Sequence, residues 1–341
     1  MHQGSGVRDF ALGAARILAR GVPFEGVCFL TLDPETLVPT GEIVDNGLPP
    51  AALARLAAIE LGGDDFNAFQ SLALSDFHTA TLSQVTGGDL DRSERHREIR
   101  APHGFGDELR AVLVDEGAAW GALTLLRGAD REPFSPADAQ LVEAVRRHLA
   151  EGLRRALLLA RDASEPSEAD EGVGVVVFAP DGSTAFVDER AVAWMDELDS
   201  NGGVPPVVTA VMSRARILGA GHGSGGHIAR ARVQARSGHW LVVRASLLGD
   251  EPGARVAVMI EPARPHELAP LLADAYRLSD REREVTQLVA RGLPTDAVAA
   301  RLHLSPWTVQ DHLKAIFEKV GVATRGELVA RLFFRHRTPR L

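Results

Sequence analysis

Lysine is almost absent from this sequence of 341 residues. Of its 37 basic residues 35 are arginines, and both lysines, Lys314 and Lys319, lie near the carboxyl end. A Walker-type phosphate-binding loop needs a lysine after its glycines, and a protein kinase needs one on a strand that contacts ATP. A phosphorylation receiver domain likewise uses a lysine beside its acidic pocket. The sequence before Lys314 therefore excludes all three.

Cysteine is nearly absent as well. Cys28 is the single cysteine, which excludes an internal disulfide and any zinc or iron–sulfur site with several cysteine ligands. This fits a reducing compartment. The sequence also has no apolar run of about 18 residues and no basic segment followed by an apolar one, the patterns of a membrane span and an export signal. We therefore expect a cytoplasmic protein without a membrane partner.

The acidic net charge of −9 is unevenly distributed along the chain. Residues 276–341 contain 12 basic and 7 acidic residues, a net charge of +5, which leaves −14 for the rest. Apolar residues make up 45% and charged residues 24%, an ordinary globular composition. At about 150 residues per domain, the length predicts two or three domains. A basic end on an acidic body is typical of a nucleic-acid-binding domain attached to another module.

The first 161 residues show the pattern of an α+β domain. Glu116-Gly117 predicts a hairpin between two strands, and Ser135-Pro136 caps a long helix that reaches to about residue 161. Further helices are expected over residues 1–20 and 51–61, and strands over residues 27–32, 40–45, 107–115 and 120–127. The long helix has a continuous apolar stripe, which leaves two interpretations open: pairing with its copy in a dimer, or packing on its own domain.

The middle of the chain predicts a small antiparallel α+β unit between two linkers. Residues 162–171 are polar and acidic, and residues 261–270 contain Pro262, Pro265 and Pro270, so both are expected to be linkers. Strands are expected over residues 173–178, 184–187, 228–235, 240–247 and 256–260, with a helix over residues 191–198.

Residues 278–334 predict four short helices with clear ends. Ser279 with Glu282, and Thr324 with Glu327, have the spacing of capping boxes. Ser305 precedes a proline at the first position of the third helix, where the missing N–H has no cost. Two helices joined by about three residues, the second with polar residues outward, form a helix-turn-helix.

This segment resembles the LuxR-type DNA-binding domain. The resemblance is carried by residues 278–285 (LSDREREV), 290–293 (ARGL), 305–312 (SPWTVQDH), 319–322 (KVGV) and 325–328 (RGEL), in the order and spacing of the family. It implies an all-α four-helix domain over residues 274–336, whose second and third helices form the helix-turn-helix. The fourth helix commonly dimerises in this family, which assigns a dimer contact to Leu328, Val329, Leu332 and Phe333.

The resemblance also assigns DNA contacts to the third helix. Gln310, Asp311 and Lys314 match groove-facing positions, where they can pair with adenine, cytosine N4 and guanine. Contacts to the DNA backbone are expected from Trp307, Thr308, His312, Lys319 and Arg325. Three alternatives stay open: His312 packs inside the domain, Asp311 only repels phosphate, and Trp307 covers the edge of the core.

The sequence departs from the family at two positions. Asp296 and Gln310 stand where lysines are common in the family. Both changes remove positive charge, so we expect a modest affinity for phosphates.

The other two segments resemble sensor modules. Residues 1–161 are similar to a GAF domain through residues 104–110 (GFGDELR), 120–125 (WGALTL) and 134–138 (FSPAD). Residues 172–261 are similar to a PAS domain through residues 174–182 (GVVVFAPDG). The arrangement resembles an actinobacterial type of LuxR regulator and implies a multidomain α+β protein.

The sequence identifies no ligand for these modules. Cys28, in an apolar strand, is expected to be an inert thiol rather than a redox sensor, and His96 and His103 to be solvated loop residues rather than haem or metal ligands. The glycine- and histidine-rich residues 221–227 are expected to be a loop, so no metal and no cofactor is predicted. The single tyrosine, Tyr276, lies outside the first segment and argues against an acyl-homoserine-lactone sensor.

These features predict a homodimeric, sequence-specific transcription regulator that binds double-stranded DNA. A small ligand or a partner at the GAF-like domain would control it, and RNA polymerase is a candidate partner. In the alternative, the two upstream domains only dimerise or bind a protein without sensing a ligand. An enzyme is not expected, because the sequence offers no paired carboxylates, nucleophile elbow or metal cluster.

Overall fold

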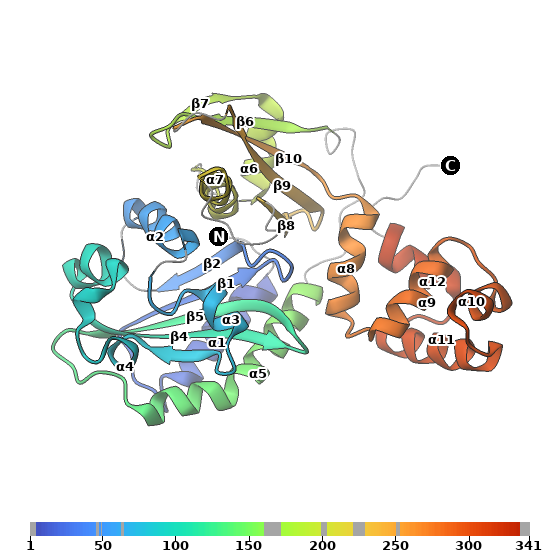
Figure 1. Cartoon of the computed structure of the whole chain (residues 1–341), viewed down its shortest axis with the longest axis horizontal. Helices are drawn as coiled ribbons and strands as arrows, with labels where there is room; N and C mark the ends of the chain where they lie inside the picture. The colour runs from blue at the N-terminus through green and yellow to red at the C-terminus, as the bar shows by residue number, and fades with distance from the viewer. Residues whose placement is uncertain are drawn as a thin grey trace. The chain divides into compact units, whose positions relative to one another are not determined.

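The computed structural model describes residues 5–45, 48, 50–62, 65–159, 172–198, 203–220, 229–249 and 253–334. These residues divide into two compact units (Figure 1). The first contains the described residues up to Pro262, and the second begins at Ala263. The first holds two antiparallel sheets and the second is helical, which confirms the multidomain α+β class.

The first sheet has five antiparallel strands in the order β2-β1-β5-β4-β3. They are β1 (Gly26–Leu32), β2 (Pro39–Asp45), β3 (Thr79–Thr81), β4 (Phe105–Asp115) and β5 (Ala118–Gly128). The predicted hairpin joins β4 to β5. Glu116 and Gly117 have φ angles of 49° and 82°, the positive values that a tight two-residue hairpin turn requires.

One face of this sheet packs against two helices, α1 (Ser5–Leu18) and α5 (Pro136–Leu159) (Figure 1). The two helices approach closely at Gly152, where an added Cβ would lie 2.2 Å from the Phe10 ring. Leu149, Leu153 and Ala156, in the second half of α5, are buried in this core. Packing on its own domain therefore accounts for the helix over both halves.

The other face of the first sheet is covered by short helices that the sequence pattern did not predict, apart from α2. These are α2 (Pro50–Gly62), α3 (Phe69–Leu74) and three single turns, Leu90–Arg92, His96–Arg100 and Ala101–His103. Helix α4 (Leu82–Thr86), also not predicted, follows β3, and its Ser83 donates to Asp107 of β4. A small apolar cluster fills one end of this face, and charged side chains fill the rest.

The second sheet has the order β7-β6-β10-β9-β8, also fully antiparallel. Its strands are β6 (Gly174–Phe178), β7 (Thr184–Val187), β8 (Arg230–Gln234), β9 (Trp240–Leu248) and β10 (Arg255–Pro262). Two helices complete the core on one face, α6 (Glu189–Leu198) and α7 (Pro206–Gly219). The sequence pattern missed α7, although Pro206 takes the first helical position and Val207, Val211 and Ala215 recur at helical spacing.

The two sheets are joined within the first unit. Arg232 of β8 donates to Asp33, in the turn after β1, with its Nη2 2.6 Å and its Nε 2.9 Å from the carboxylate oxygens. Both side chains are buried, at 2% and 0% exposure. Val38 and Leu61, from the first segment, belong to the core of the second sheet. The first unit is therefore held together by shared apolar packing and a buried ion pair.

The prediction of a linker over residues 261–270 is wrong. Strand β10 extends to Pro262, and Pro265 opens helix α8 (Pro265–Ala275). Arg264 precedes the helix, and Glu267 accepts from the Arg264 N–H at 2.8 Å. Pro265 is tolerated because the first helical N–H has no partner in any case. Pro270 lies inside α8 and removes only one backbone hydrogen bond. The other predicted linker, residues 162–171, lies outside the described residues.

The second unit continues with α9 (Asp280–Ala290), α10 (Thr295–Leu302), α11 (Pro306–Val320) and α12 (Arg325–Val329). A wider final turn covers Ala330–Phe334. The capping box at Ser279 and Glu282 is present. At Thr324 only half of it forms: the Thr324 hydroxyl accepts from the Glu327 N–H, whereas the Glu327 carboxylate accepts from Ala323. Among the described helices of the whole chain, none is long and apolar enough to cross a membrane.

Candidate nucleic-acid interface

The turn between α10 and α11 has well-defined ends. His303 closes α10 with a φ of 54°, a left-handed conformation that costs about 1 kcal/mol in a residue other than glycine. Ser305 then caps α11 by accepting from the Thr308 N–H at 3.1 Å, and Pro306 takes the first helical position. The predicted helix-turn-helix is thus formed by α10 and α11.

Helix α11 has one buried and one exposed side. Its buried side is formed by Val309, Leu313, Ile316 and Val320, which pack on α9 and α10. Trp307, Gln310, Asp311 and Lys314 are all exposed, and their spacing of three, four and seven residues places them along one face. We call these four residues the exposed stripe of α11.

Trp307 is 78% exposed, so the interpretation that it covers the edge of the core is wrong. An exposed tryptophan at the start of a helix is unusual in a monomeric domain, because large aromatic side chains are normally mostly buried. Thr308 and His312 are half-buried on the flank of the stripe, and the Thr308 hydroxyl lies 2.8 Å from that of Ser305.

The amine of Lys319 is bonded to residues of its own domain. Its Nζ donates to Glu282 Oε2 at 2.7 Å and to the Arg277 carbonyl at 3.0 Å, and its side chain is 38% exposed. Burial disfavours the charge on Glu282, but Lys319 and Ser279 outweigh that cost and hold the pKa of Glu282 below its usual value. The contact fastens the end of α11 to the start of α9.

Arg325 also forms hydrogen bonds within its own domain. Its guanidinium donates to the Leu293 carbonyl at 3.1 Å and to Thr295 Oγ1 at 2.7 Å, so it ties the start of α12 to the loop before α10. In the structure Lys319 and Arg325 therefore connect helices of their own domain. Neither lies on the exposed stripe.

The residues assigned to a dimer contact on the fourth helix lie in different environments. Leu328 and Leu332 are buried within the second unit of a single chain, and Val329 is half-buried. For Phe333 the structure describes the backbone alone. Arg331 Nε lies 3.3 Å from the Tyr276 hydroxyl, which connects the end of this helix to α8.

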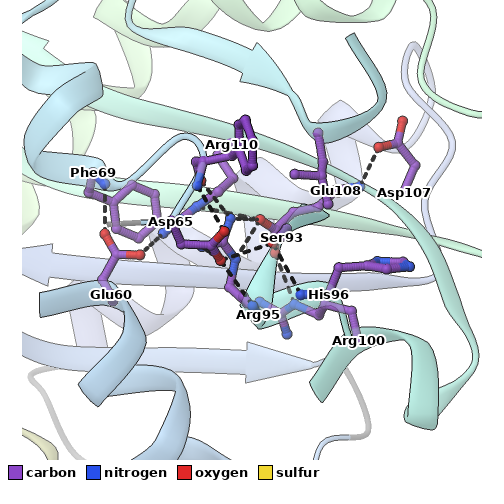
Figure 2. A network of polar contacts seen from close by, with 12 residues as sticks. Glu60, Asp65, Phe69, Ser93, Arg95, His96, Arg100, Asp107, Glu108 and Arg110 are labelled. Atoms are coloured by element: carbon purple, nitrogen blue, oxygen red, sulfur yellow. Dashed lines mark hydrogen bonds and ion pairs between the residues drawn. The ribbon is translucent and has the colours of Figure 1, made fainter. Parts of the chain in front are cut away.

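The first unit contains a second polar group, a cluster of ion pairs between the first sheet and its short helices (Figure 2). Glu108 of β4 is 1% exposed and accepts from Arg95 Nε at 3.0 Å and from Arg100 Nε at 2.9 Å. Arg110, on the same face of β4, lies 3.7 Å from Glu108 and pairs with Glu60 of α2 at 2.5 Å. We call these five residues the Glu108 cluster.

The Glu108 cluster is electrostatically matched but not fully hydrogen-bonded. Burial opposes the charge of Glu108, but the three arginines outweigh it and hold its pKa far below the usual range. Within the described part of the chain, Arg100 Nη1 and the Nε and Nη1 of Arg110 are buried without a hydrogen-bond partner. Sequence reasoning missed this cluster, although Glu108 and Arg110 lie in the quoted segment 104–110.

The candidate ligand residues of the first segment also have defined environments. His96 is buried, contrary to the expected solvated loop, and burial lowers its pKa. His103 is exposed, and its Nδ1 lies 2.7 Å from the Ile99 carbonyl. Burial and the charge of Glu42 raise the pKa of the Cys28 thiol to about 12, consistent with an unreactive thiol.

No group of three or more metal-ligating side chains occurs among the residues that the structure describes. The glycine- and histidine-rich residues 221–227 lie outside them.

Solved structures show weak likeness to the chain. A GAF domain/HD domain protein from Geobacter sulfurreducens has a TM-score of 0.33 and 19% identity, over 45% of this chain and 94% of that one. SdiA of Escherichia coli has a TM-score of 0.33 and 12% identity, over 97% of this chain and 91% of that one. At TM-scores this low, the similarity gives no information about function.

Curated sequence relatives are more similar, over shorter stretches of the chain. The transcriptional regulatory protein DesR of Bacillus subtilis is 33% identical over 96 residues, which are 26% of this chain and 48% of DesR. UhpA of Escherichia coli is 43% identical over 56 residues, 16% of this chain and 29% of UhpA. The chain thus spans half or less of the length of these two relatives.

The model of the GerE family, described as bacterial regulatory proteins of the luxR family, matches residues 276–332. These residues include α9 to α12 and the exposed stripe of α11. Residues 276–332 are therefore a helix-turn-helix domain of the luxR type of bacterial regulatory proteins.

Proposed function

We propose that the chain is a homodimeric transcription regulator that reads a specific DNA site with the exposed stripe of α11. The observation that carries this proposal is the alignment of Trp307, Gln310, Asp311 and Lys314 along one exposed face of a helix in a LuxR-type domain. A helix of this kind fits the major groove with its first turns against the bases.

The stripe offers the chemistry for base recognition. Gln310 can donate to and accept from adenine, Asp311 can accept from cytosine N4, and Lys314 can donate to guanine. We propose that Trp307, Thr308 and His312 contact the DNA backbone beside them. Lys319 and Arg325 support binding from behind, because their donors fix α11 and α12 in place.

We propose a dimer because major-groove helices of this size gain affinity by reading two half-sites. Leu328 and Leu332 are used inside one chain, so on the fourth helix only side chains outside this core, such as Val329, are available to a second copy. The functional domains proposed from the sequence remain residues 1–161, 172–261 and 274–336, the first GAF-like and the second PAS-like. Because its proposed partner is chromosomal DNA, the protein would act in the cytoplasm and without catalysis of its own.

We further propose that a ligand or partner acts on the GAF-like segment. The unpartnered N–H groups of Arg100 and Arg110 favour a small anion as the ligand, since buried donors normally have acceptors. The mutual pairing within the Glu108 cluster favours the alternative, in which the segment has a structural role and binds only a protein such as RNA polymerase. Thermal unfolding of the purified protein with added anions or cell extract separates the two, because a ligand of the folded state raises Tm.

Selection of binding sequences from random double-stranded DNA tests the DNA-binding proposal directly. We expect a palindromic site, and we expect Lys314→Ala to weaken binding to that site about tenfold. Arg281→Ala is the matched control, because Arg281 is an exposed cation on α9 that pairs with Glu284 and lies outside the stripe. Equal affinity of wild type and Lys314→Ala, or no enriched sequence, would contradict the proposal.

A further inference from the structure

The two lysines of the chain differ in a way that the sequence does not show. They lie five residues apart on α11, yet Lys319 Nζ is held by Glu282 Oε2 at 2.7 Å and by the Arg277 carbonyl at 3.0 Å. Lys314 is exposed, and its Nζ has no hydrogen-bond or ion-pair partner among the described residues. Every other basic side chain except histidine is an arginine, whose guanidinium is not a useful nucleophile because it stays protonated.

From this difference we propose that Lys314 is a site of N-acylation by an acyl phosphate, and that acylation switches off DNA binding. The inference rests on the proposed function of the exposed stripe. Both lysines reach solvent, but only the Lys314 amine is unpaired among the described residues, so a reagent that acylates amines would act first at Lys314.

The chemistry requires only the deprotonated amine and an acyl phosphate. The Lys314 amine loses its proton to solvent, and its lone pair attacks the carbonyl carbon. An N–C bond forms, the nitrogen gives its second proton to solvent, the C–O bond to phosphate breaks, and inorganic phosphate leaves with the bonding electrons. The product is a neutral amide, so the side chain changes from a charge of +1 to zero and loses most of its donors.

Lys319 is protected from the same reaction by its partners. Its amine would have to leave both Glu282 and the Arg277 carbonyl before it could attack, and the ion pair favours the protonated form. The expected order of reactivity is therefore Lys314 well ahead of Lys319.

The loss of Lys314 would matter more here than in a lysine-rich domain. Asp296 on α10 and Gln310 on α11 are both exposed, and neither supplies a positive charge. Asp311, beside Lys314 on the stripe, adds a negative charge that the acylated helix would no longer offset. Neutralisation would leave the stripe with a net negative charge.

The test treats the full-length protein with acetyl phosphate, locates the adducts by peptide mass spectrometry and measures affinity for the selected DNA site. Lys314→Arg keeps the charge but removes the amine, and Lys319→Arg is the matched control five residues away. Each variant is compared with its own untreated sample. We expect acetylation of wild type mainly at Lys314 and a loss of affinity of about tenfold or more.

Treated Lys314→Arg should keep its untreated affinity, and treated Lys319→Arg should lose affinity as wild type does. Equal modification of both lysines, or the same loss of affinity in wild type and Lys314→Arg, would overturn the inference. Untreated wild type that binds no selected DNA would instead overturn the proposed function, and with it the switch. Tight DNA binding that acetylation of Lys314 leaves unchanged would overturn only the switch.

Discussion

The two compact units differ in how deeply their cations are buried, because among the described residues every buried arginine lies in the first unit. In the first unit, Arg95, Arg100, Arg110 and Arg232 are buried and paired with carboxylates of the same unit. In the second unit, Lys319 is fastened to Glu282, but Lys314 is exposed on the recognition helix. Net charge alone therefore says little about where a protein offers a positive surface, because a buried, paired arginine contributes almost nothing to the field outside.

The largest effect is expected from Glu108→Gln, which tests whether the buried ion pairs stabilise the first unit. The neutral amide would leave Arg95, Arg100 and Arg110 with much less compensating charge in a buried site. We expect a loss of about 3–5 kcal/mol in the free energy of unfolding, the range for removing one partner of a buried ion pair. Urea denaturation followed by the fluorescence of the buried Trp120 measures it. Glu98→Gln, which removes an exposed carboxylate paired with Arg55, should leave the midpoint unchanged; equal effects of the two variants would show that the Glu108 cluster is not important for stability.

The second prediction concerns the joint between the two sheets. Asp33→Asn keeps the shape of the side chain but removes the buried one of the two carboxylate charges that Arg232 contacts, the other being the half-exposed Glu35. We expect the free energy of unfolding of the first unit to fall by about 3 kcal/mol. We also expect the two sheets to unfold in separate transitions. Calorimetry of the full chain would show an additional transition. A single transition at the wild-type temperature would contradict a coupling role for the pair.

The third prediction tests the internal use of Lys319. Lys319→Met should reduce the stability of the second unit by about 1 kcal/mol, discounted because the lysine is partly exposed. Hydrogen exchange of the α9 and α11 amides measures it locally. Lys314→Met is the control, and its amide protection should equal that of wild type.

The same pair predicts a pH dependence. The pKa of Glu282 is lowered in the folded state, so its contribution to stability is full above the unfolded value, near 4.5, and is lost as the pH falls through the lower, folded value. The difference in amide protection between wild type and Lys319→Met should therefore shrink below about pH 4. A difference that stays constant to pH 3 would exclude the Glu282 pair as its source.

The smallest effect is expected from a change of surface charge in the second unit, measured as affinity for DNA. Asp296→Lys places a cation on α10 and should raise affinity for non-specific DNA several-fold, with a salt dependence steeper by about one counterion. Titration by fluorescence anisotropy at several salt concentrations measures both. Glu284→Lys changes an exposed carboxylate on α9 by the same two charges. If both variants gain the same affinity for DNA, the effect comes from the net charge of the domain and not from the position of residue 296 on α10.

The local elements of the fold were largely predictable from the sequence. The caps at Ser279 and Ser305, and the hairpin at Glu116-Gly117, depend on neighbouring residues, so short motifs were enough. The prediction fails at residues 261–270, because three prolines indicate a linker there, whereas Pro265 occupies the first helical position, where proline is favourable.

The charged interior was not predictable, because its partners are distant in sequence. Lys319 and Glu282 are 37 residues apart and Arg232 and Asp33 are 199 apart, so no local pattern reports either pair. For the same reason the sequence predicts a contact of Lys319 with the DNA backbone and gives no sign of its pair with Glu282. The assignment of Gln310, Asp311 and Lys314 to the groove stays a prediction, but their common exposure on α11 is consistent with it.

The shared core of the two sheets has a consequence for recombination between regulators. A crossover between residues 159 and 172 would separate Val38 and Leu61 from the core that they complete, and Asp33 from Arg232. A crossover just before α8 would leave these contacts intact, because the second compact unit begins at Ala263. In a chimera with another output domain, the two sheets would thus be inherited as one module, and the usable joint would be the short stretch between Pro262 and Pro265.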